Sequence, residues 1–594
     1  MRLEAGVLQR GLRVLGRAIR EEPRVFAFAT LGSCLFGVST IAAAYVVGAI
    51  LGHVIEPAYG HDRTDERALA VAAAAIMAVS LLKITGIFGR RLGAGAMQYR
   101  LQARYRRLVT SRYLNLPIAW HQRHATGTLL SNANSDVEAA WYPIAPLPFA
   151  VGTVVMLAVA VVSLFVVDWG LALVSLAVFP GLFLVNFWYA RRMSPRISRA
   201  QQLRAEVSAA AHESFDGALV VKTMGREAHE TERFAAKAVE LRTAMINVGR
   251  IRGLFDPLLD LLPSLGTLAV LVVGGLRLRG GAVSLADVIS VAFLFSVLAV
   301  PVRAIGFVLG ELPRAAVGWE RVEQVLAATG DMPYGTVAPA GTGPASMTFE
   351  GVTYRYPTGP PVLRDVSFTV PAGRTVALVG PTGAGKSTIA ALAARLMDPD
   401  TGTVTCDGVP LPAISESALA STVALVPQIP FVFDDTVGGN VSLDRPVADP
   451  DTVRAALATA QADRFVAALP DGLDTTVGER GTSLSGGQRQ RLTLARALAG
   501  KPRLLVIDDA TSAVDPRVEA AILAALRETE AGGSPASLLV VAYRRATIAL
   551  ADVVVYLEAG RVLATGTHED LLGTVPGYAA LVTAYEDADR ELVG

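Results

Sequence analysis

The sequence contains little cysteine and little charge. Only two cysteines occur among its 594 residues, Cys34 in an apolar stretch and Cys406 in the second half of the chain. Two cysteines placed so far apart exclude a disulfide framework and do not suggest a metal site. Charged residues make up 18% of the chain and the formal net charge is +1, so no overall charge attracts nucleic acid or acidic partners. The N-terminus is charged and amphipathic, which does not match a cleavable secretion signal.

Apolar residues are what the sequence has in abundance. Hydrophobic residues make up 52% of the chain and the mean hydropathy is +0.43, values that indicate a membrane protein. Six apolar stretches are each long enough to cross about 30 Å of hydrocarbon as a helix. These stretches are Val25–Leu51, Ala68–Gly89, Trp141–Val167, Trp169–Ala190, Pro257–Leu276 and Val288–Gly310.

Arginine clusters predict which ends of these spans face the cytoplasm. One cluster follows the second span, between Arg90 and Arg107, and another follows the fourth span, between Arg191 and Arg199. Because basic residues mark the inner face of a membrane, the N-terminus and the part after the sixth span are predicted to be cytoplasmic. A basic amphipathic helix over Leu3–Arg20 is predicted to lie on the inner membrane surface against anionic headgroups, with an ordinary solvated helix as the alternative.

Two cytoplasmic segments, about Arg91–Ala140 and Arg191–Asp256, are helical in pattern and rich in charge. They are too long and too regular to be simple loops. We expect helices that continue well below the membrane, with a tight reversal in each segment.

The composition changes after Val325, where residues 327–346 become rich in Gly, Pro and Thr and predict a linker. Strands then alternate with helices, which predicts a parallel α/β sheet covered on both faces. The sequence therefore predicts a membrane α-helical domain over residues 1–326 and an α/β domain over residues 347–594. The expected strands are Met347–Tyr354, Thr375–Val379, Val423–Val426, Leu504–Ile507, Leu538–Val541 and Val553–Leu557.

A phosphate-binding loop follows the strand Thr375–Val379 and opens a helix. In such a loop, backbone N–H groups wrap the phosphates and the helix N-terminus adds a favourable field. Lys386 is expected to contact the β- and γ-phosphates of ATP, and the Ser387 hydroxyl is expected to ligate Mg²⁺. The loop and the first helical residue after it are Gly380, Pro381, Thr382, Gly383, Ala384, Gly385, Lys386, Ser387 and Thr388.

A second motif, Leu484-Ser485-Gly486-Gly487-Gln488, lies about 100 residues further on and decides the family. With it, the chain resembles the exporter-type half-transporters of the ATP-binding-cassette family, in which six membrane helices precede a P-loop cassette. The resemblance covers essentially the whole chain. It implies that two cassettes face each other head to tail, with each ATP between one chain's phosphate loop and the other chain's signature. Ser485, Gly486 and Gly487 stand at a helix N-terminus, which suits a γ-phosphate from the partner's site.

The resemblance also implies roles for residues outside these two motifs. Tyr356 would stack on adenine, and Asp515 in the segment Ser512–Asp515 would cross the dimer interface. Gln428 would link the site to the membrane helices and belong to the metal site, together with Ser387 and with Asp508, which would hold Mg²⁺ through water. Residues 475–480 resemble the short segment that touches the cytoplasmic tips of the membrane domain.

Two positions depart from the family's pattern. Asp509 follows the strand that ends in Asp508, where hydrolytic members carry Glu, and Tyr543 stands where they carry a switch histidine. The family's Glu is thought to orient or deprotonate the attacking water, and a carboxylate displaced by about 1 Å costs on the order of 10²-fold in rate. A phenol has a pKa of about 10 and does not become cationic near neutral pH. We therefore expect this site to bind ATP and to hydrolyse it slowly.

A weak site of its own and an intact signature together predict a partner. The chain is expected to form a heterodimer with a second half-transporter whose site is competent, in a bacterial plasma membrane and with an unknown small-molecule or lipid substrate. The alternatives are a homodimer with two weak sites, an exporter-shaped importer of, for example, a metal-chelating small molecule, and a non-transporting regulatory subunit. Six membrane spans exclude a soluble cassette protein.

Three cytoplasmic features resemble the family's coupling elements, against the alternative of a solvated charged helix face. The segment His121–Glu138, with Gly127 and Asp136, resembles the first cytoplasmic turn, and Arg321 resembles the arginine that leads into the linker. The segment that resembles the second cytoplasmic turn is Glu213–Phe234, with Lys222, Glu227 and Phe234.

Charges within or near the spans are candidate substrate contacts, because their burial in lipid is costly. Asp256 and Asp260 lie four residues apart and hence on one face of the fifth helix. Arg303 lies at a similar depth in the sixth helix, and Lys83 lies near the inner end of the second. The alternatives are an Asp260–Arg303 pair that joins helices, and a Lys83 side chain that reaches for the interface.

Overall fold

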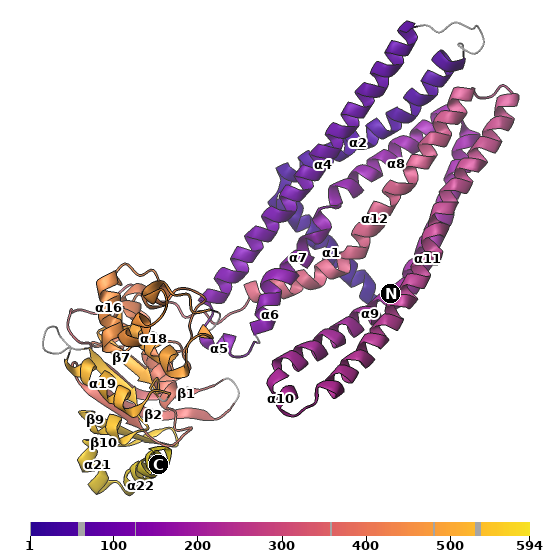
Figure 1. Cartoon of the computed structure of the whole chain (residues 1–594). Coiled ribbons are helices and arrows are strands. Elements are labelled where there is room, and N and C mark those ends of the chain that lie inside the picture. The colour runs from indigo at the N-terminus through magenta and orange to yellow at the C-terminus, as the bar shows by residue number, and fades with distance from the viewer. Residues whose placement is uncertain are drawn as a thin grey trace. The chain divides into compact units, whose positions relative to one another are not determined.

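The computed structural model describes residues 2–56, 66–124, 126–356, 359–478, 481–511, 513–528 and 536–593 (Figure 1). Its internal contacts divide the chain into two units. One unit is helical and comprises Met1–Ser111 and Gly127–Ala327. The other is the α/β cassette, and comprises Ala328–Gly594 together with the short segment Arg112–Thr126 from the first cytoplasmic reversal.

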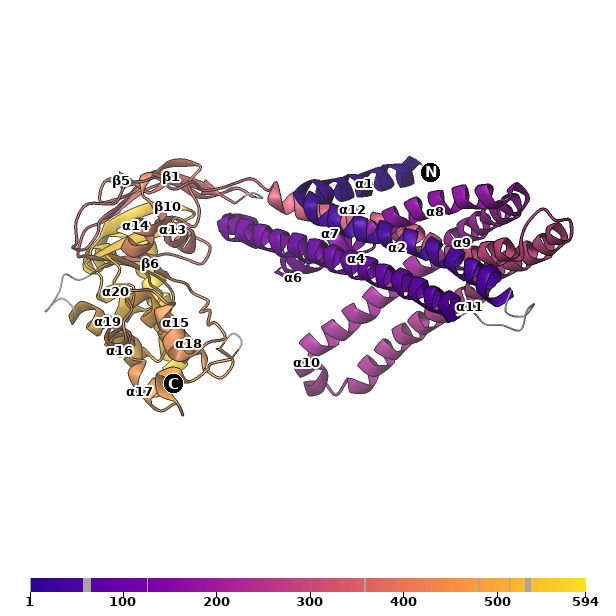
Figure 2. The same ribbon diagram turned by 90° about the horizontal axis from the view of Figure 1, so that it is seen from above.

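Long helices form the first unit, and Figures 1 and 2 show them running beside one another. Four stretches among the described residues are long and apolar enough to cross a membrane, Pro23–Ile55, Glu66–Asn115, Gly127–Val167 and Leu261–Arg279, and Leu285–Phe295 is a shorter apolar helix. The fourth and sixth predicted spans lie in α9 and α12. The helices are α1 (Arg2–Glu21), α2 (Pro23–Ile50), α4 (Glu66–Asn115), α6 (Thr126–Ser131), α7 (Val137–Trp141), α8 (Leu147–Val167), α9 (Trp169–Asp216), α10 (Ala218–Thr223), α11 (Glu227–Arg279) and α12 (Leu285–Leu326), with α5 (Ile118–His121) in the other unit.

Helices continue well beyond the apolar stretches, and their place below the membrane stays a prediction. Helix α9 continues to Asp216 and α11 starts at Glu227, so only the short α10 lies between two helices of 48 and 53 residues. Lys237 of α11 donates a 2.8 Å hydrogen bond to Glu206 of α9, which links these two long helices. The third predicted span lies within the apolar stretch Gly127–Val167, but its start is irregular, because Tyr142–Ile144 form a 3-10 helix before α8 begins at Leu147. Prolines at positions 143 and 146 lack the N–H that a continuous helix requires.

The N-terminal helix α1 packs on protein. Its apolar side is buried at Val14, Leu15 and Ala18. A Cβ at Gly11 would lie only 2.8 Å from the Cβ of Leu312, so α1 and α12 approach closely there. The apolar side is thus covered by α12 around Val14, Leu15 and Ala18, and the position of this helix on the membrane surface stays a prediction.

The cassette contains two sheets, of which only one was expected. The six-stranded sheet has the order β10-β9-β3-β8-β7-β6, and its neighbouring strands are parallel except for the β10–β9 pair. The predicted strand Met347–Tyr354 is β1, which lies in a separate antiparallel sheet of order β2-β1-β4-β5. The strands are β1 (Met347–Arg355), β2 (Pro361–Val370), β3 (Thr375–Val379), β4 (Thr401–Cys406), β5 (Val409–Pro410), β6 (Val423–Val426), β7 (Leu504–Asp508), β8 (Ser537–Val541), β9 (Val553–Glu558) and β10 (Arg561–Gly566).

Buried apolar residues fill both sides of the six-stranded sheet, because its parallel strands are almost continuously hydrophobic. The parallel strands share one carboxyl edge, and the loops that leave β3, β7 and β8 meet there. The helices of the cassette are α13 (Lys386–Ala393), α14 (Glu416–Thr422), α15 (Val437–Ser442), α16 (Pro450–Thr459), α17 (Asp463–Ala467), α18 (Gly486–Leu498), α19 (Pro516–Glu528), α20 (Arg545–Ala549), α21 (His568–Thr574) and α22 (Pro576–Val593).

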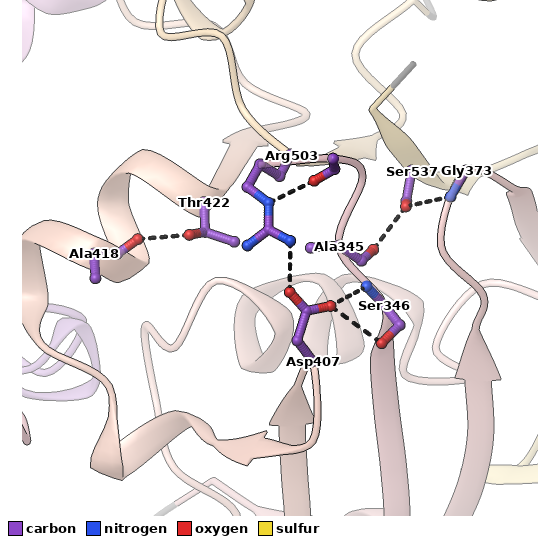
Figure 3. A network of polar contacts seen from close by, with 9 residues as sticks. Ala345, Ser346, Gly373, Asp407, Ala418, Thr422, Arg503 and Ser537 are labelled. Atoms are coloured by element: carbon purple, nitrogen blue, oxygen red, sulfur yellow. Dashed lines mark hydrogen bonds and ion pairs between the residues drawn. The ribbon is translucent and has the colours of Figure 1, made fainter. Parts of the chain in front are cut away.

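The end of the predicted linker is hydrogen-bonded into the cassette (Figure 3). The Ala345 N–H donates to the Arg503 carbonyl, and the Ala345 carbonyl accepts from the Ser537 hydroxyl at 2.6 Å. The Ser346 N–H donates to Asp407, whose other carboxylate oxygen accepts from Arg503 at 2.7 Å. The last linker residues are thus part of the packed cassette.

Candidate active site

The phosphate loop connects β3 to α13 and is shaped by glycine. Gly385 has φ +102°, a left-handed conformation that side chains disfavour, and it stands directly before the first helical residue, Lys386. At Gly380 a Cβ would lie 2.2 Å from the Leu557 carbonyl oxygen, so only glycine fits there. The loop therefore brings its backbone close to α13, whose N-terminus favours an anion.

Lys386 is bonded to its own loop. Its side chain is buried, with 3% of the residue exposed, and its Nζ donates to the carbonyls of Gly380 at 2.6 Å and Pro381 at 3.0 Å. The ring of Tyr543 lies 4.4 Å from the same nitrogen. Burial lowers the pKa of Lys386 to about 8, against the opposing effect of two nearby carboxylates. A phosphate that binds Lys386 must therefore draw it away from these internal partners.

Two adjacent acids lie at the end of β7. The Ser387 hydroxyl donates to Asp508 at 3.0 Å, and burial raises the pKa of Asp508. The Gln428 amide donates to Asp509 at 3.1 Å, and burial raises the pKa of Asp509 as well, opposed by this hydrogen bond. Hydroxyl and carboxylate oxygens suit Mg²⁺, so the neighbouring oxygens of Ser387 and Asp508 fit such an ion beside a bound phosphate.

A cavity of about 450 Å³ brings nine of the predicted site residues together. Gln428, Asp509 and Tyr543 reach it from three different loops. Tyr356 does not line it, but its hydroxyl lies 3.3 Å from the Thr388 hydroxyl. Sequence reasoning missed Val362 of β2. The lining residues are Val362, Thr382, Gly383, Gly385, Lys386, Ser387, Thr388, Gln428, Asp509 and Tyr543.

A pair of tyrosines covers the lysine. Tyr543 follows β8, and its ring lies 6.0 Å from that of Tyr585 in α22. The Tyr585 hydroxyl donates at 3.0 Å to the Gly380 carbonyl, which also accepts from Lys386. Burial and the carboxylates of Asp509 and Asp508 raise the pKa of Tyr543, which keeps its phenol neutral. Sequence reasoning missed Tyr585, because no motif marks a residue 205 positions from its hydrogen-bond acceptor.

A buried ion pair lies behind Asp509 and was also missed. Glu519 pairs with Arg544 and accepts hydrogen bonds from the hydroxyls of Thr511, at 3.0 Å, and Thr547, at 2.7 Å. A second cavity, of about 130 Å³, is lined by these four residues together with Asp509 and Tyr543. The charges of Glu519 and Arg544 act on the pKa of Asp509 in opposite directions, so this pair belongs to the electrostatic surroundings of the site.

The signature begins helix α18 as predicted. The Ser485 hydroxyl accepts from the Gln488 N–H, and the Gln488 side chain accepts from the Ser485 N–H at 2.8 Å. At Gly487 a Cβ would lie 2.7 Å from the Ala513 carbonyl oxygen. Asp515 accepts from the Arg517 N–H at 2.8 Å. None of these residues is among those that line the described cavity around Lys386. Glu479, Arg480 and Ser512, named from the sequence, lie outside the described residues.

Two of the predicted coupling residues meet in the helical unit. Arg321 donates to Asp136 at 3.3 Å, and only 7% of Asp136 is exposed. In the second coupling segment, Lys222 lies 3.8 Å from Glu227. The candidate substrate contacts Asp256, Asp260 and Arg303 have side chains outside the described part of the chain.

Comparison with known proteins follows the same division. Residues 26–302 match the family model of the ABC transporter transmembrane region, and residues 363–512 match the ABC transporter model. A multidrug efflux ATP-binding/permease protein of Mycobacterium tuberculosis is 32% identical over 529 residues, which cover 89% of this chain. The chain belongs to the ABC transporter family. It spans only 44% of the length of that relative, so more than half of the relative lies outside the match.

Two further proteins also match most of the chain. A fatty acid ABC transporter ATP-binding/permease protein of Mycobacterium bovis is 31% identical over 526 residues, which cover 88% of this chain and 82% of the relative. The solved structure of a bacterial Atm1-family ABC exporter with ATP bound shares 27% identity and covers 95% of this chain at a TM-score of 0.76. This ABC transporter therefore has the exporter-type membrane domain and a P-loop cassette of the ATP-hydrolysing family.

Proposed function

We propose that this ABC transporter is one half of a heterodimeric, ATP-driven exporter of a bacterial plasma membrane. It holds ATP in its own cavity, hydrolyses it slowly there, and lends Ser485–Gln488 to a partner's faster site. The substrate class is a small amphipathic molecule, a proposal supported by the printed names of two relatives, multidrug efflux and fatty acid transporter.

The arrangement around Tyr543 and Asp509 carries this proposal. A neutral phenol lies against Lys386 where the family's histidine is expected, and the short carboxylate of Asp509 is held by Gln428. Asp509 also has φ +50°, a left-handed conformation that fixes where its side chain starts. Neither side chain supplies an imidazole or the longer reach of Glu, whereas the phosphate loop and the signature are complete.

The first test restores the missing groups. The double variant Asp509→Glu/Tyr543→His is expected to raise the ATPase rate at this chain's own site on the order of 10²-fold, measured in the purified complex with the partner's own site inactivated. Asp509→Asn is the matched control, since it removes the charge at constant size, and it should leave the low rate of the original chain almost unchanged. A large loss in Asp509→Asn would mean that Asp509 already serves hydrolysis, and the weak-site proposal would fail.

The second test concerns the partner. Affinity purification from the native membrane, followed by mass determination, should yield a complex with a second, different half-transporter. That partner should carry Glu directly after the strand that corresponds to β7. Ser485→Arg in this chain should then abolish most of the ATPase activity of the complex. A complex that contains only copies of this chain and hydrolyses ATP briskly would replace the heterodimer with a homodimer.

A further inference from the structure

Two cations of α4 lie over aromatic rings in the helical unit. The Nζ of Lys83 lies 5.6 Å from the ring centre of Phe36. The guanidinium of Arg90 lies 5.6 Å from the same ring and 4.1 Å from the ring of Phe149. Phe36 belongs to α2 and Phe149 to α8, so the group joins three helices (Figure 1). Lys83 and Arg90 are seven positions apart in the sequence, which places both on one face of α4.

Glycines create this close approach. A Cβ at Gly86 would lie 2.6 Å from the backbone nitrogen of Phe36, and one at Gly32 would lie 2.6 Å from the backbone nitrogen of Arg90. The backbones of α2 and α4 are therefore in direct contact at this level. This contact holds the Phe36 ring beside the basic face of α4 and leaves little freedom to either.

The two cations lack a counter-charge among the described residues. No ion pair joins Lys83 or Arg90 to a carboxylate in the described ranges, in contrast to Arg100, which lies 3.6 Å from Glu22. The Nε of Arg90 is buried without a hydrogen-bond partner. Aromatic rings attract cations through their quadrupole but carry no net charge. Two neighbouring positive charges in or near a membrane therefore still favour an anion.

Their depth fits the cytoplasmic headgroup region. About 20 helical residues cross about 30 Å of hydrocarbon, so a span that starts near Ala68 ends close to Arg90. Lys83 lies roughly 10 Å deeper, within reach of the interface by its long side chain. The neighbouring side chain Leu82 is 49% exposed and offers an apolar surface to an acyl chain.

We propose that Lys83, Arg90, Phe36 and Phe149 form a binding site for the headgroup of an anionic phospholipid of the cytoplasmic leaflet. The phosphate lies against both cations, while an acyl chain follows the exposed apolar side of α4 at Leu82. Anionic lipids are concentrated in this leaflet, and basic pockets between membrane helices on this side recognise them. The site is independent of how the cassettes hydrolyse ATP.

The test measures lipid retention by native mass spectrometry on the purified transporter complex, with phosphatidylglycerol compared with phosphatidylcholine. The unsubstituted complex should retain phosphatidylglycerol in preference. Arg90→Gln and Lys83→Gln should each weaken this retention about fivefold, and leave phosphatidylcholine unchanged. Lys83→Gln also serves if Arg90→Gln disturbs folding, because Lys83 contacts a single ring.

Arg107→Gln is the matched control. It removes the same charge about 25 Å further along α4, where the Nε of Arg107 donates to the Ala103 carbonyl. Equal retention of both lipids by the unsubstituted complex would overturn the proposal, and so would an equal loss in Arg107→Gln, since that would indicate diffuse attraction. Displacement of the lipid by millimolar inorganic phosphate would also overturn it, because the site would then bind a free anion.

Discussion

The phosphate loop and the signature are both helix N-termini suited to phosphate, but they differ in how their side chains are engaged. At the signature, Ser485 and Gln488 satisfy each other's backbone and leave the start of α18 ordered without any ligand. At the phosphate loop, the principal cation is committed to the Gly380 and Pro381 carbonyls and covered by Tyr543. The signature is preorganised, whereas the loop must exchange internal bonds for bonds to ATP.

Of these two regions, only the phosphate-loop region carries the residues that depart from the family's pattern, Asp509 and Tyr543. The elements that bind phosphate are complete in both regions, and the substitutions at Asp509 and Tyr543 lie on the hydrolytic side of a single region. Under the proposed function, a chain with this distribution holds one nucleotide and completes a second site. Substitutions confined to one region or the other can separate their contributions experimentally.

The largest effect is expected for Lys386→Met, which keeps the length of the side chain and removes its charge. Loss of two charge-assisted contacts to phosphate should weaken ATP binding to this chain on the order of 10³-fold. Titration with a fluorescent ATP analogue measures the change. Ser485→Ala is the comparison variant, and it should leave binding to the separate chain unaltered. An equal loss in both variants would show that the two regions do not act separately.

Gly487→Ala should lower the ATPase activity of the assembled transporter on the order of 10²-fold. The new Cβ would lie 2.7 Å from the Ala513 carbonyl, so the start of α18 must move by a fraction of an ångström or more. Steady-state phosphate release measures this loss. Gly573→Ala is the control, because no atom lies within 4 Å of its Cβ position. Normal turnover in Gly487→Ala would contradict a close fit of the signature to a phosphate.

Local motifs explain how much of this site could be predicted from the sequence. The phosphate loop, the signature and the strands β3 and β6 each depend on a short continuous segment, and β3 and β6 have the predicted bounds. Asp136 and Arg321 were also named one by one from the sequence. Their 3.3 Å contact could not be predicted, because it depends on packing between segments that are distant in the sequence.

The parts that could not be predicted are tertiary. Tyr585 reaches the phosphate loop from the last described helix, and Glu519 is buried because Arg544, Thr511 and Thr547 converge on it. β1 alternates as any strand does, and its partners β2 and β4 decide that its sheet is antiparallel. The amphipathic pattern of α1 likewise predicts a covered face without saying whether lipid or α12 covers it.

ATP binding should depend on pH through Lys386. Its pKa of about 8 lies below the ordinary value of 10.5, so the ammonium loses its proton as the pH rises through 8. ATP favours the charged form, and affinity should therefore fall about tenfold between pH 7 and pH 9. Folding stability without nucleotide should change with pH in the opposite direction to ATP affinity. It should increase from about pH 8 to about pH 10.5, because the unfolded chain retains the Lys386 proton in that range.

Calorimetry in two buffers of different ionisation enthalpy would detect the accompanying proton uptake. Lys386→Arg is the control, since a guanidinium stays charged over this range and its affinity should not vary with pH. A pH dependence of the same size in Lys386→Arg would assign the effect to another group.

The smallest effect is expected for Tyr585→Phe. The Gly380 carbonyl accepts from both Lys386 and Tyr585, so the tyrosine still satisfies it when ATP draws the lysine away. Without the hydroxyl, that carbonyl loses its second donor, and ATP affinity should fall about fivefold, equivalent to about 1 kcal/mol. Tyr578→Phe removes a hydroxyl from the same helix that contacts His568 instead. It should cost similar folding stability and leave ATP affinity unchanged, whereas equal affinity losses in the two variants would reduce Tyr585 to a packing residue of α22.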